Sequence, residues 1–252
     1  MEPRRLRALL LRARPLAESD LLLDLYSREL GRITAIAKGA KRSKRRFFGL
    51  LETGHLLEID VEPGRRGDLW LLLGARLVNP HLGLRQDWRR LLWAGPVLEL
   101  LLRATAPHDP QPGALDLAQS TLGLLERSRG GADSLAALAI FLLRLLGELG
   151  FGLRLEACLH CGQPAGQISA PRLSLEGGLV CPACPPGRRA VAAPPGLVAF
   201  LRAAQTMEPA ALGRLRLSPA LARPGLVYLA DFWREVSGHD LPALGLAVEL
   251  AA

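Results

Sequence analysis

The chain has 252 residues, which is enough for one large domain or several small ones that each bury a core. Its composition, with 49% apolar and 22% charged residues, excludes an intrinsically disordered chain. The 32 basic residues outnumber the 24 acidic ones, and the formal net charge of +8 favours a polyanionic partner.

The first third of the chain has the pattern of short strands separated by turn residues, with strands expected at 6–13, 20–27, 32–38, 55–62 and 68–77. Alternating residues should point to opposite faces. In the second strand this places Leu21, Leu23 and Leu25 on one face, and Asp20, Leu22, Asp24 and Tyr26 on the other. In the fourth strand the inward residues should be Leu57, Ile59 and Val61, and the outward ones Glu58, Asp60 and Glu62. Five strands in about 75 residues predict a small closed barrel of the oligonucleotide-binding type, an OB-fold, over residues 1–80.

The positive charge is concentrated in this first third. Residues 1–80 hold sixteen basic and ten acidic side chains, and the third strand runs into the sequence KGAKRSKRR. We call residues 38–46 the basic segment, and its cations are Lys38, Lys41, Arg42, Lys44, Arg45 and Arg46. It could be a solvated loop, but its place beside an OB barrel favours a site for the phosphate backbone of a nucleic acid. We expect Arg32, and Arg65 and Arg66 of the loop before the fifth strand, to lie on the same side.

Aromatic residues accompany the basic segment. Phe47 and Phe48 follow it directly, and Tyr26 is expected on the outer face of the neighbouring strand. These rings could stack on bases, although a Phe pair after a loop more often packs into a core. The acidic outer face of the fourth strand should repel a nucleic acid, so the ligand is expected on the side of the basic segment.

Beyond residue 80 the apolar period becomes helical, which predicts a mostly α-helical domain over residues 81–252. The clearest helix spans 134–149, with Asp133 expected to cap its start and Gly150 its end. Pro96 should kink or break an earlier helix. Further helices are expected near 195–206 and 224–237, connections at 107–113 and 129–131, and loops with helical pieces at 205–225.

All four cysteines form one pattern, with the first pair at Cys158 and Cys161 and the second at Cys181 and Cys184. Two CxxC pairs at this spacing are typical of a zinc site, since each knuckle supplies two thiolates and four complete a tetrahedron. A filled coordination sphere leaves no position for water, so one structural zinc ion is expected in a module spanning residues 155–190. Its negative charge could be balanced by Arg154, Arg172, Arg188 and Arg189.

The cysteines could instead form disulfides, remain free thiols or act as a redox pair. In a zinc site, His160 could replace one of the thiolates as a ligand. A zinc deaminase is excluded, because Pro182 follows a cysteine where that signature needs the proline before it. The P-loop, HExxH, GxSxG and dinucleotide-binding signatures are also absent, which favours a protein that is not an enzyme. Charges interrupt the apolar runs, as at Arg144, and no signal-peptide cleavage pattern is seen, so we expect no membrane span and a cytoplasmic location.

The order of parts in the chain resembles that of the bacterial RecO family of recombination mediators. The similarity is carried by LLLDLYSRELGRITAIAKGAKR near the start, IFLLRLLGELGFGLRLEAC in the middle, and then CLHCG and CPAC. The resemblance implies a multidomain α+β protein with an N-terminal five-stranded OB barrel, followed by a helical domain with an inserted four-cysteine zinc module. It also implies a role in DNA repair and recombination after DNA damage, at the nucleoid.

The activities implied by this resemblance are binding of single- and double-stranded DNA, annealing of complementary strands, and association with RecR. Such proteins help RecA to displace single-strand binding protein. Some RecO-like proteins lack the four cysteines, so the metal is expected to act as a scaffold. Two other functions remain open at this point, an RNA-binding or translation-associated zinc protein and a thiol oxidoreductase that uses one CxxC pair.

Overall fold

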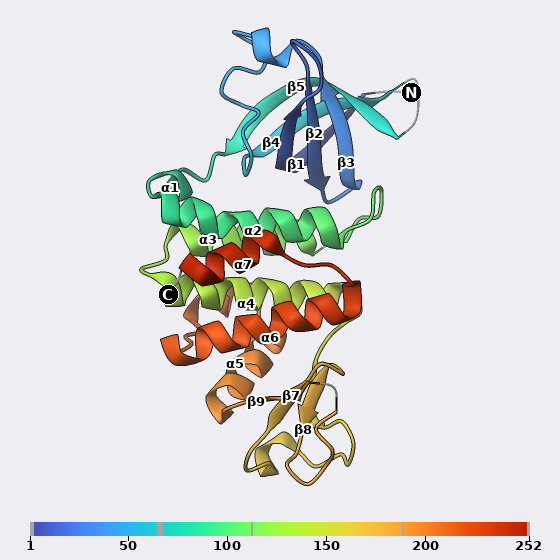
Figure 1. Ribbon diagram of the computed structural model, residues 1–252. Coiled ribbons are helices and arrows are strands. Elements are labelled where there is room, and N and C mark those ends of the chain that lie inside the picture. Colours follow the sequence, from blue (N-terminus) through green and yellow to red (C-terminus); the bar gives the residue numbers. More distant parts are fainter. Residues whose placement is uncertain (1–2, 65–67, 112, 188, 251–252) are drawn as a thin grey trace. The chain divides into compact units, whose positions relative to one another are not determined.

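The computed structural model describes residues 3–64, 68–111, 113–187 and 189–250 (Figure 1). Arg65, Arg66 and Arg188, to which the sequence assigned electrostatic roles, lie outside these residues. The chain divides into two compact units, Met1–Leu122 and Gly123–Ala252. This division groups the first helices with the strands that precede them, and the predicted domain boundary at residue 80 stays a prediction.

The first unit contains a closed five-stranded barrel. Its strands are β1 (Arg4–Pro15), β2 (Leu21–Ser27), β3 (Gly31–Ala37), β4 (Leu56–Pro63) and β5 (Leu69–Asn79). The order around the barrel is β1-β2-β3-β5-β4, with β3 and β5 parallel and the other neighbours antiparallel. The prediction of five strands and of a barrel is therefore confirmed, with strand ends that differ by a few residues.

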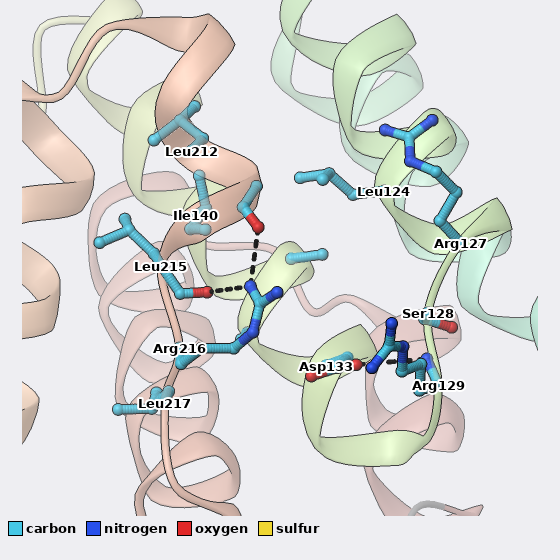
Figure 2. Close-up of a pocket in the computed structure, with 13 residues that line it drawn as sticks. Leu124, Arg127, Ser128, Arg129, Asp133, Ile140, Leu212, Leu215, Arg216 and Leu217 are labelled. Carbon is cyan, nitrogen blue, oxygen red and sulfur yellow. Dashed lines mark hydrogen bonds between the residues drawn. The ribbon is translucent and has the colours of Figure 1, made fainter.

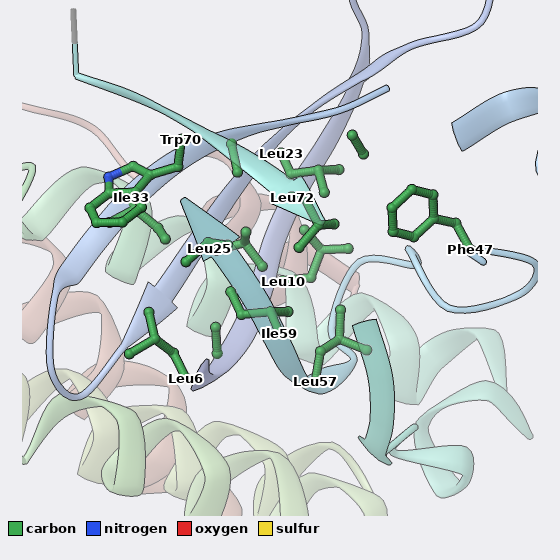
Figure 3. Packing of buried hydrophobic residues seen from close by; sticks show 14 residues of the cluster. Leu6, Leu10, Leu23, Leu25, Ile33, Phe47, Leu57, Ile59, Trp70 and Leu72 are labelled. Atoms are coloured by element: carbon green, nitrogen blue, oxygen red, sulfur yellow. The ribbon is translucent and has the colours of Figure 1, made fainter. Parts of the chain in front are cut away.

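The inward residues of the strands fill the barrel (Figure 3). In β4 the alternation is as predicted, because the three apolar residues Leu57, Ile59 and Val61 are fully buried. In β2 the alternation is incomplete, since Asp24 and Tyr26 on the second face are also buried. Both faces of β2 are therefore covered. The Asp24 carboxylate and the Tyr26 hydroxyl each form hydrogen bonds with other groups of the protein.

Strand β1 changes its inward phase half-way along. Leu6, Ala8 and Leu10 belong to the barrel core, and after Leu10 the inward residue is Ala13. The pairing of β1 with β2 shifts between Leu10 and Arg12, which is the mark of a β-bulge. An extra residue at this point moves every later side chain of β1 to the opposite face.

Three helices follow the barrel in the first unit: α1 (Leu82–Arg85), α2 (Trp88–Ala104) and the start of α3 (Ala114–Glu126). Asp87 caps α2 by accepting a hydrogen bond from Arg89 N, and α2 packs against β1. Pro96 was expected to kink or break a helix, and it does not break one, because it lies inside the continuous helix α2. The connection 105–111 then returns to the barrel, where His108 N donates to Arg32 O.

The second unit is built around the buried helix α4 (Gly131–Glu148), which packs against α5 (Pro195–Thr206) and α6 (Pro219–Ser237). The start of α4 differs from the prediction, since Gly130 is the capping residue and Asp133 lies in the first turn. Its end agrees, because Gly150 follows with a positive φ of 85°. Helix α6 begins before its expected start, with Pro224 inside it, and α7 (Pro242–Leu250) is an additional helix.

A small four-stranded sheet interrupts the helices of the second unit. Its strands are β6 (Arg154–Cys158), β7 (Arg172–Ser174), β8 (Gly178–Val180) and β9 (Val191–Ala192), in the order β6-β8-β7-β9. Three short 3-10 turns complete the described structure, at Ala40–Arg42, Ala165–Gln167 and Pro209–Arg214. Among the described helices, none combines the length and the apolar character that crossing a membrane requires.

Candidate nucleic-acid interface and candidate metal centre

The basic segment leaves the barrel at the end of β3 and is folded back onto the β1–β2 connection. Gly39 adopts the left-handed conformation with a φ of 66°, which lets the chain turn. Its N–H donates to Asp20 Oδ1 over 2.8 Å, and Lys41 N donates to Ser19 O over 2.9 Å. The hydrogen bond from Gly39 N, assisted by that from the Ser19 hydroxyl, lowers the pKa of Asp20.

The far end of the basic segment is anchored by an aromatic side chain. Phe47 is buried in the barrel core with 3% of its surface exposed, and its N–H donates to the Ser43 hydroxyl. The segment is therefore held at both ends by backbone hydrogen bonds and core packing. None of these anchors uses a charged group of the segment.

The cations of the basic segment are exposed: Lys38, Lys41, Arg42, Lys44, Arg45 and Arg46. Within the described chain, Arg42 alone among them forms an ion pair, 3.1 Å from Glu18, and both side chains are largely exposed. Such a pair contributes little in water. Lys41 Nζ and an Arg46 Nη donate to backbone carbonyls, and the Arg46 guanidinium lies 4.4 Å from the centre of the Phe47 ring. The segment thus keeps most of its charge available to a ligand.

Arg32 lies apart from the basic segment. It is at the start of β3, and the six residues to Lys38 correspond to about 20 Å of strand. Its Nε donates to Thr105 O over 3.0 Å, which ties the 105–111 connection to the barrel. The structure therefore brings together the other six predicted contact residues but not Arg32.

The three aromatic residues have different environments. Phe48 is 76% exposed beside the basic segment, and it is the one of the three that can stack on a base. Phe47 is a core residue. Tyr26 is fully buried, and its hydroxyl donates to Gln111 O and accepts from Gln111 N. Tyr26 lies on the outer face, as predicted, because it is not part of the barrel core. The 105–111 connection covers that face, so the suggestion that Tyr26 could stack on a base is wrong.

The acidic outer face of β4 is matched by arginines on its neighbours. Arg5 of β1 lies 2.8 Å from Asp60 and 3.6 Å from Glu58. Arg76 of β5 lies 3.8 Å from Glu58. These arginines offset the charges of Glu58 and Asp60, whereas most cations of the basic segment have no acidic partner among the described residues.

The barrel surface also carries two arginines that were not predicted to be site residues. Arg12 and Arg14 of β1 both approach the buried carboxylate of Asp24, at 2.8 Å and 3.3 Å. Each arginine side chain is 45% exposed, whereas that of Asp24 is 3% exposed. The signal in the sequence was the spacing of two arginines with one residue between them near the end of a strand.

The four cysteines are brought together by the pairing of two strands. Cys158 ends β6 and Cys181 follows β8, and these strands are hydrogen-bonded neighbours. The four sulfur atoms lie within 4.8 Å of one another, and this is the one group of potential ligands found in the described residues. The cluster could hold a metal ion.

The geometry of the cysteine cluster fits zinc. Cys161 Sγ and Cys181 Sγ are 3.7 Å apart. Tetrahedral zinc with Zn–S bonds of about 2.3 Å requires a separation of about 3.8 Å. A disulfide requires about 2.05 Å, and all four cysteines are free thiols. His160 is not part of the cluster, since its Nε2 faces Glu176 Oε2 at 3.7 Å.

The environment of the sulfurs also suits thiolate ligands. Burial of Cys158 opposes its ionisation, but the N–H groups of Cys161, Cys181 and His160 lower its pKa to about 6. The neighbouring sulfurs of Cys181 and Cys161 raise the pKa of Cys184 to about 12. Four crowded sulfurs cannot all ionise without a compensating cation, and a dication supplies that charge.

Arginine supports the backbone of the second knuckle. One Arg172 Nη donates to Cys181 O and to Cys184 O, both over 3.0 Å. The expectation that Arg172 lies near the cysteines is therefore confirmed. Among the described residues, Arg154 and Arg189 make no recorded contact with a cysteine side chain.

A separate pocket of about 420 Å³ lies within the second unit, between α4 and the Pro209–Arg214 turn (Figure 2). Its lining includes the apolar residues Leu124, Ile140, Leu212, Leu215 and Leu217. The lining also includes three arginines, Arg127, Arg129 and Arg216, and a single carboxylate, Asp133. Arg216 projects into the pocket and donates to Gly213 O and Leu215 O. A lining that combines apolar residues and cations is suited to an acidic chain segment that also carries apolar side chains.

Comparison with known proteins matches both parts of the chain to one family. Residues 1–81 match the model described as Recombination protein O N terminal, and residues 85–245 match Recombination protein O C terminal. A DNA repair protein RecO from Anaeromyxobacter dehalogenans is 33% identical over 244 residues, covering 96% of this chain and 95% of the relative. Proteins of the same description from Myxococcus xanthus and Syntrophobacter fumaroxidans are 36% and 32% identical, over 79% and 86% of this chain and 80% and 85% of theirs.

Proposed function

Since the chain belongs to the RecO family of DNA repair proteins, we propose that it binds single- and double-stranded DNA through the basic segment and anneals complementary strands. The observation that carries this proposal is the exposed, anchored segment of six cations beside an OB barrel. The OB barrel is a fold that commonly binds oligonucleotides on one face and its adjoining loops. The basic segment adds positive charge at one end of that face, and acidic side chains of the protein neutralise little of this charge.

Annealing requires that two like-charged strands come together with their bases accessible. Cations that contact phosphates reduce the repulsion between strands and release counterions. Phe48 offers one exposed ring to a base at the same place. These contacts act by binding and need no nucleotide hydrolysis, so we propose a function that is not enzymatic.

The proposed site is tested by replacing its six cations with alanine: Lys38, Lys41, Arg42, Lys44, Arg45 and Arg46. We expect DNA affinity to fall at least about tenfold and the dependence of affinity on salt to become shallower. Unchanged affinity and salt dependence would contradict the proposal. An RNA competitor of the same length in the same assay distinguishes a DNA-binding from an RNA-binding protein.

A smaller pair of variants controls for net charge. Lys44→Ala/Arg45→Ala removes two charges from the basic segment, and Arg214→Ala/Arg223→Ala removes two exposed charges from the second unit. The first pair should weaken DNA binding and strand annealing in the absence of nucleotide. The second pair should leave both nearly unchanged.

We also propose that single-strand binding protein is a partner and that its tail docks in the pocket of the second unit (Figure 2). The three arginines of the lining would contact carboxylates, and its apolar residues would contact an apolar side chain. Replacing Arg127 and Arg216 with alanine should weaken binding of single-strand binding protein and leave binding of bare DNA intact. Unchanged binding of single-strand binding protein would show that its tail does not dock in this pocket.

RecR association and assistance to RecA are proposed from membership of the family. The appropriate assay measures RecA assembly on strands coated with single-strand binding protein, with and without RecR. We propose that this activity takes place in the cytoplasm at the nucleoid. A loss of RecA assembly in the six-alanine variant would connect the basic segment to it.

We propose one structural zinc ion per chain, bound by Cys158, Cys161, Cys181 and Cys184. The separation of the sulfurs and the N–H groups directed at Cys158 support this choice of metal. Four thiolates fill a tetrahedral shell, so the ion would hold the β6–β9 sheet together rather than activate water. Metal analysis together with thiol titration tests the proposal, since titratable thiols without metal would instead support a redox function.

A further inference from the structure

The β-bulge in β1 determines where two arginines point. Leu6, Ala8 and Leu10 face the barrel core, so an unbroken alternation would also direct residues 12 and 14 inward. The bulge between Leu10 and Arg12 reverses the phase, and Ala13 takes the next inward position. Arg12 and Arg14 consequently lie on the outer face of the barrel.

A buried carboxylate holds these two side chains. Asp24 Oδ2 accepts from Arg12 Nε at 2.8 Å and from one Arg14 Nη at 3.3 Å, while Asp24 Oδ1 accepts from the Thr34 hydroxyl at 3.0 Å. Burying a carboxylate is costly unless it is paired and hydrogen-bonded. These three donors satisfy it, two from β1 and one from β3, the strands on either side of Asp24 in β2.

The donors that remain are suited to a phosphate. Arg12 uses its Nε, which leaves both of its Nη groups, and Arg14 uses one Nη. Among the described residues, no further hydrogen-bond partner is recorded for either guanidinium. A guanidinium fork with two free N–H groups binds phosphate oxygens in a bidentate manner. The cluster of two cations and one anion keeps one net positive charge.

The cluster lies at the end of the barrel that carries the basic segment. Across the sheet, Arg14 is opposite Leu22, which is opposite Ile36, two residues before Lys38. Three adjacent strands span about 10 Å between Arg14 and Ile36. A nucleic-acid strand held by the basic segment could therefore continue over this face of β1, β2 and β3.

From this geometry we infer that Arg12 and Arg14 form a second phosphodiester-binding site and that Asp24 is its positioning residue. The inference rests on the proposed function, since the ligand is the same DNA strand that the basic segment binds. In this site the acidic residue strengthens DNA binding because it fixes two guanidinium groups in a rigid arrangement. Net charge alone predicts the opposite effect on DNA affinity, because removing an acidic residue should strengthen the binding of a polyanion.

This difference in sign is the test. Asp24→Asn adds one net positive charge and retains the size of the side chain. We expect it to weaken single-stranded DNA binding about fivefold at moderate salt, whereas tighter or equal binding by the folded variant would overturn the inference. Thermal unfolding monitored by circular dichroism establishes that the variant is folded.

Arginine variants keep the test decisive if Asp24→Asn does not fold. Arg12→Ala/Arg14→Ala should lower DNA affinity and reduce the slope of log affinity against log salt by about 1 to 2. Arg12→Lys/Arg14→Lys keeps the charge but loses the forked donors, so it should retain most of the slope and recover only part of the affinity. Unchanged affinity and slope in the double-alanine variant would overturn the inference.

Comparison with the six-alanine variant separates this inference from the proposed function. If the six-alanine variant loses DNA binding while Arg12→Ala/Arg14→Ala binds as the unmodified protein does, the second site is wrong and the basic segment remains. If both bind as the unmodified protein does, both proposals are wrong. In folded proteins, the loss caused by Arg12→Ala/Arg14→Ala should also be smaller in the Asp24→Asn background, because the arginines are then already displaced.

Discussion

The basic segment and the cysteine cluster are both short loop regions rich in functional side chains, but they direct those side chains oppositely. In the basic segment, backbone groups and Phe47 hold the chain while its cations extend into solvent. In the cysteine cluster, the functional sulfurs face one another and the backbone N–H groups point at them. The basic segment therefore keeps its charges available to an external ligand, whereas the cysteine cluster turns its potential metal ligands towards one another.

The largest expected effect concerns the cysteine cluster. Cys181→Ser removes a buried member of the proposed zinc site, and the β6–β9 sheet should then fail to bind zinc and unfold, since metal binding can supply on the order of 10 kcal/mol to the folding of a small module. Zinc analysis and hydrogen exchange across residues 154–192 measure this loss. The basic segment should remain protected, and DNA affinity should change by less than about twofold. A parallel collapse of DNA binding would show that the two regions are not independent.

Directly after the basic segment, two adjacent phenylalanines have different roles: Phe47 anchors the segment, and Phe48 is proposed to bind a base. Phe47→Ala removes a core side chain and should lower the free energy of unfolding by about 3 to 5 kcal/mol. Urea denaturation followed by fluorescence measures this change. A loss below about 1 kcal/mol would contradict the role of Phe47 as the anchor of the segment.

Phe48→Ala is the matched variant on the exposed side of the same dipeptide. It should leave the free energy of unfolding almost unchanged and weaken single-stranded DNA binding by about 1 to 3 kcal/mol. Binding of duplex DNA should change less, because its bases are already stacked. Equal losses for single- and double-stranded DNA would argue against stacking and for a general effect on the loop.

The smallest expected effect concerns the turn that starts the basic segment. The hydrogen bond from Gly39 N lowers the pKa of Asp20, so ionised Asp20 stabilises the fold at pH values above its ordinary pKa of 3.8. This stabilisation is lost as the pH falls through the lower pKa of the folded state. Asp20→Asn should therefore be less stable than the unmodified protein near pH 7, with a difference that narrows towards pH 3. Melting temperatures across this range measure it, and a constant difference would exclude the ionised carboxylate as its source.

Sequence periodicity was sufficient to predict the barrel and the cysteine site. Strand β4 alternates without interruption, so Leu57, Ile59 and Val61 could be assigned to the core from spacing alone. The two CxxC pairs predicted a common site from their spacing alone, and the structure brings them together because Cys158 ends β6, Cys181 follows β8, and these strands pair. In both cases local pattern and long-range packing agree.

Other features depended on contacts that periodicity does not encode. Tyr26 is buried because a connection 85 residues away in sequence covers it. The outward direction of Arg12 and Arg14 depends on one extra residue in β1, and the sequence contains no signal for that bulge. Pro96 and Pro224 lie inside helices because the packing of α2 and α6 outweighs the local cost of proline.

The close fit between the barrel and the 105–111 connection has a practical consequence for dissecting the protein. A Cβ atom at Gly31 would lie 2.6 Å from Asp109 O, so the backbone of β3 packs directly against the backbone of the connection at this point. The same connection covers Tyr26, and the His108 ring lies 6.3 Å from that of Trp70. A fragment that stops at residue 80 would leave these aromatic surfaces bare and tend to aggregate, whereas one that extends past residue 111 would retain their natural cover.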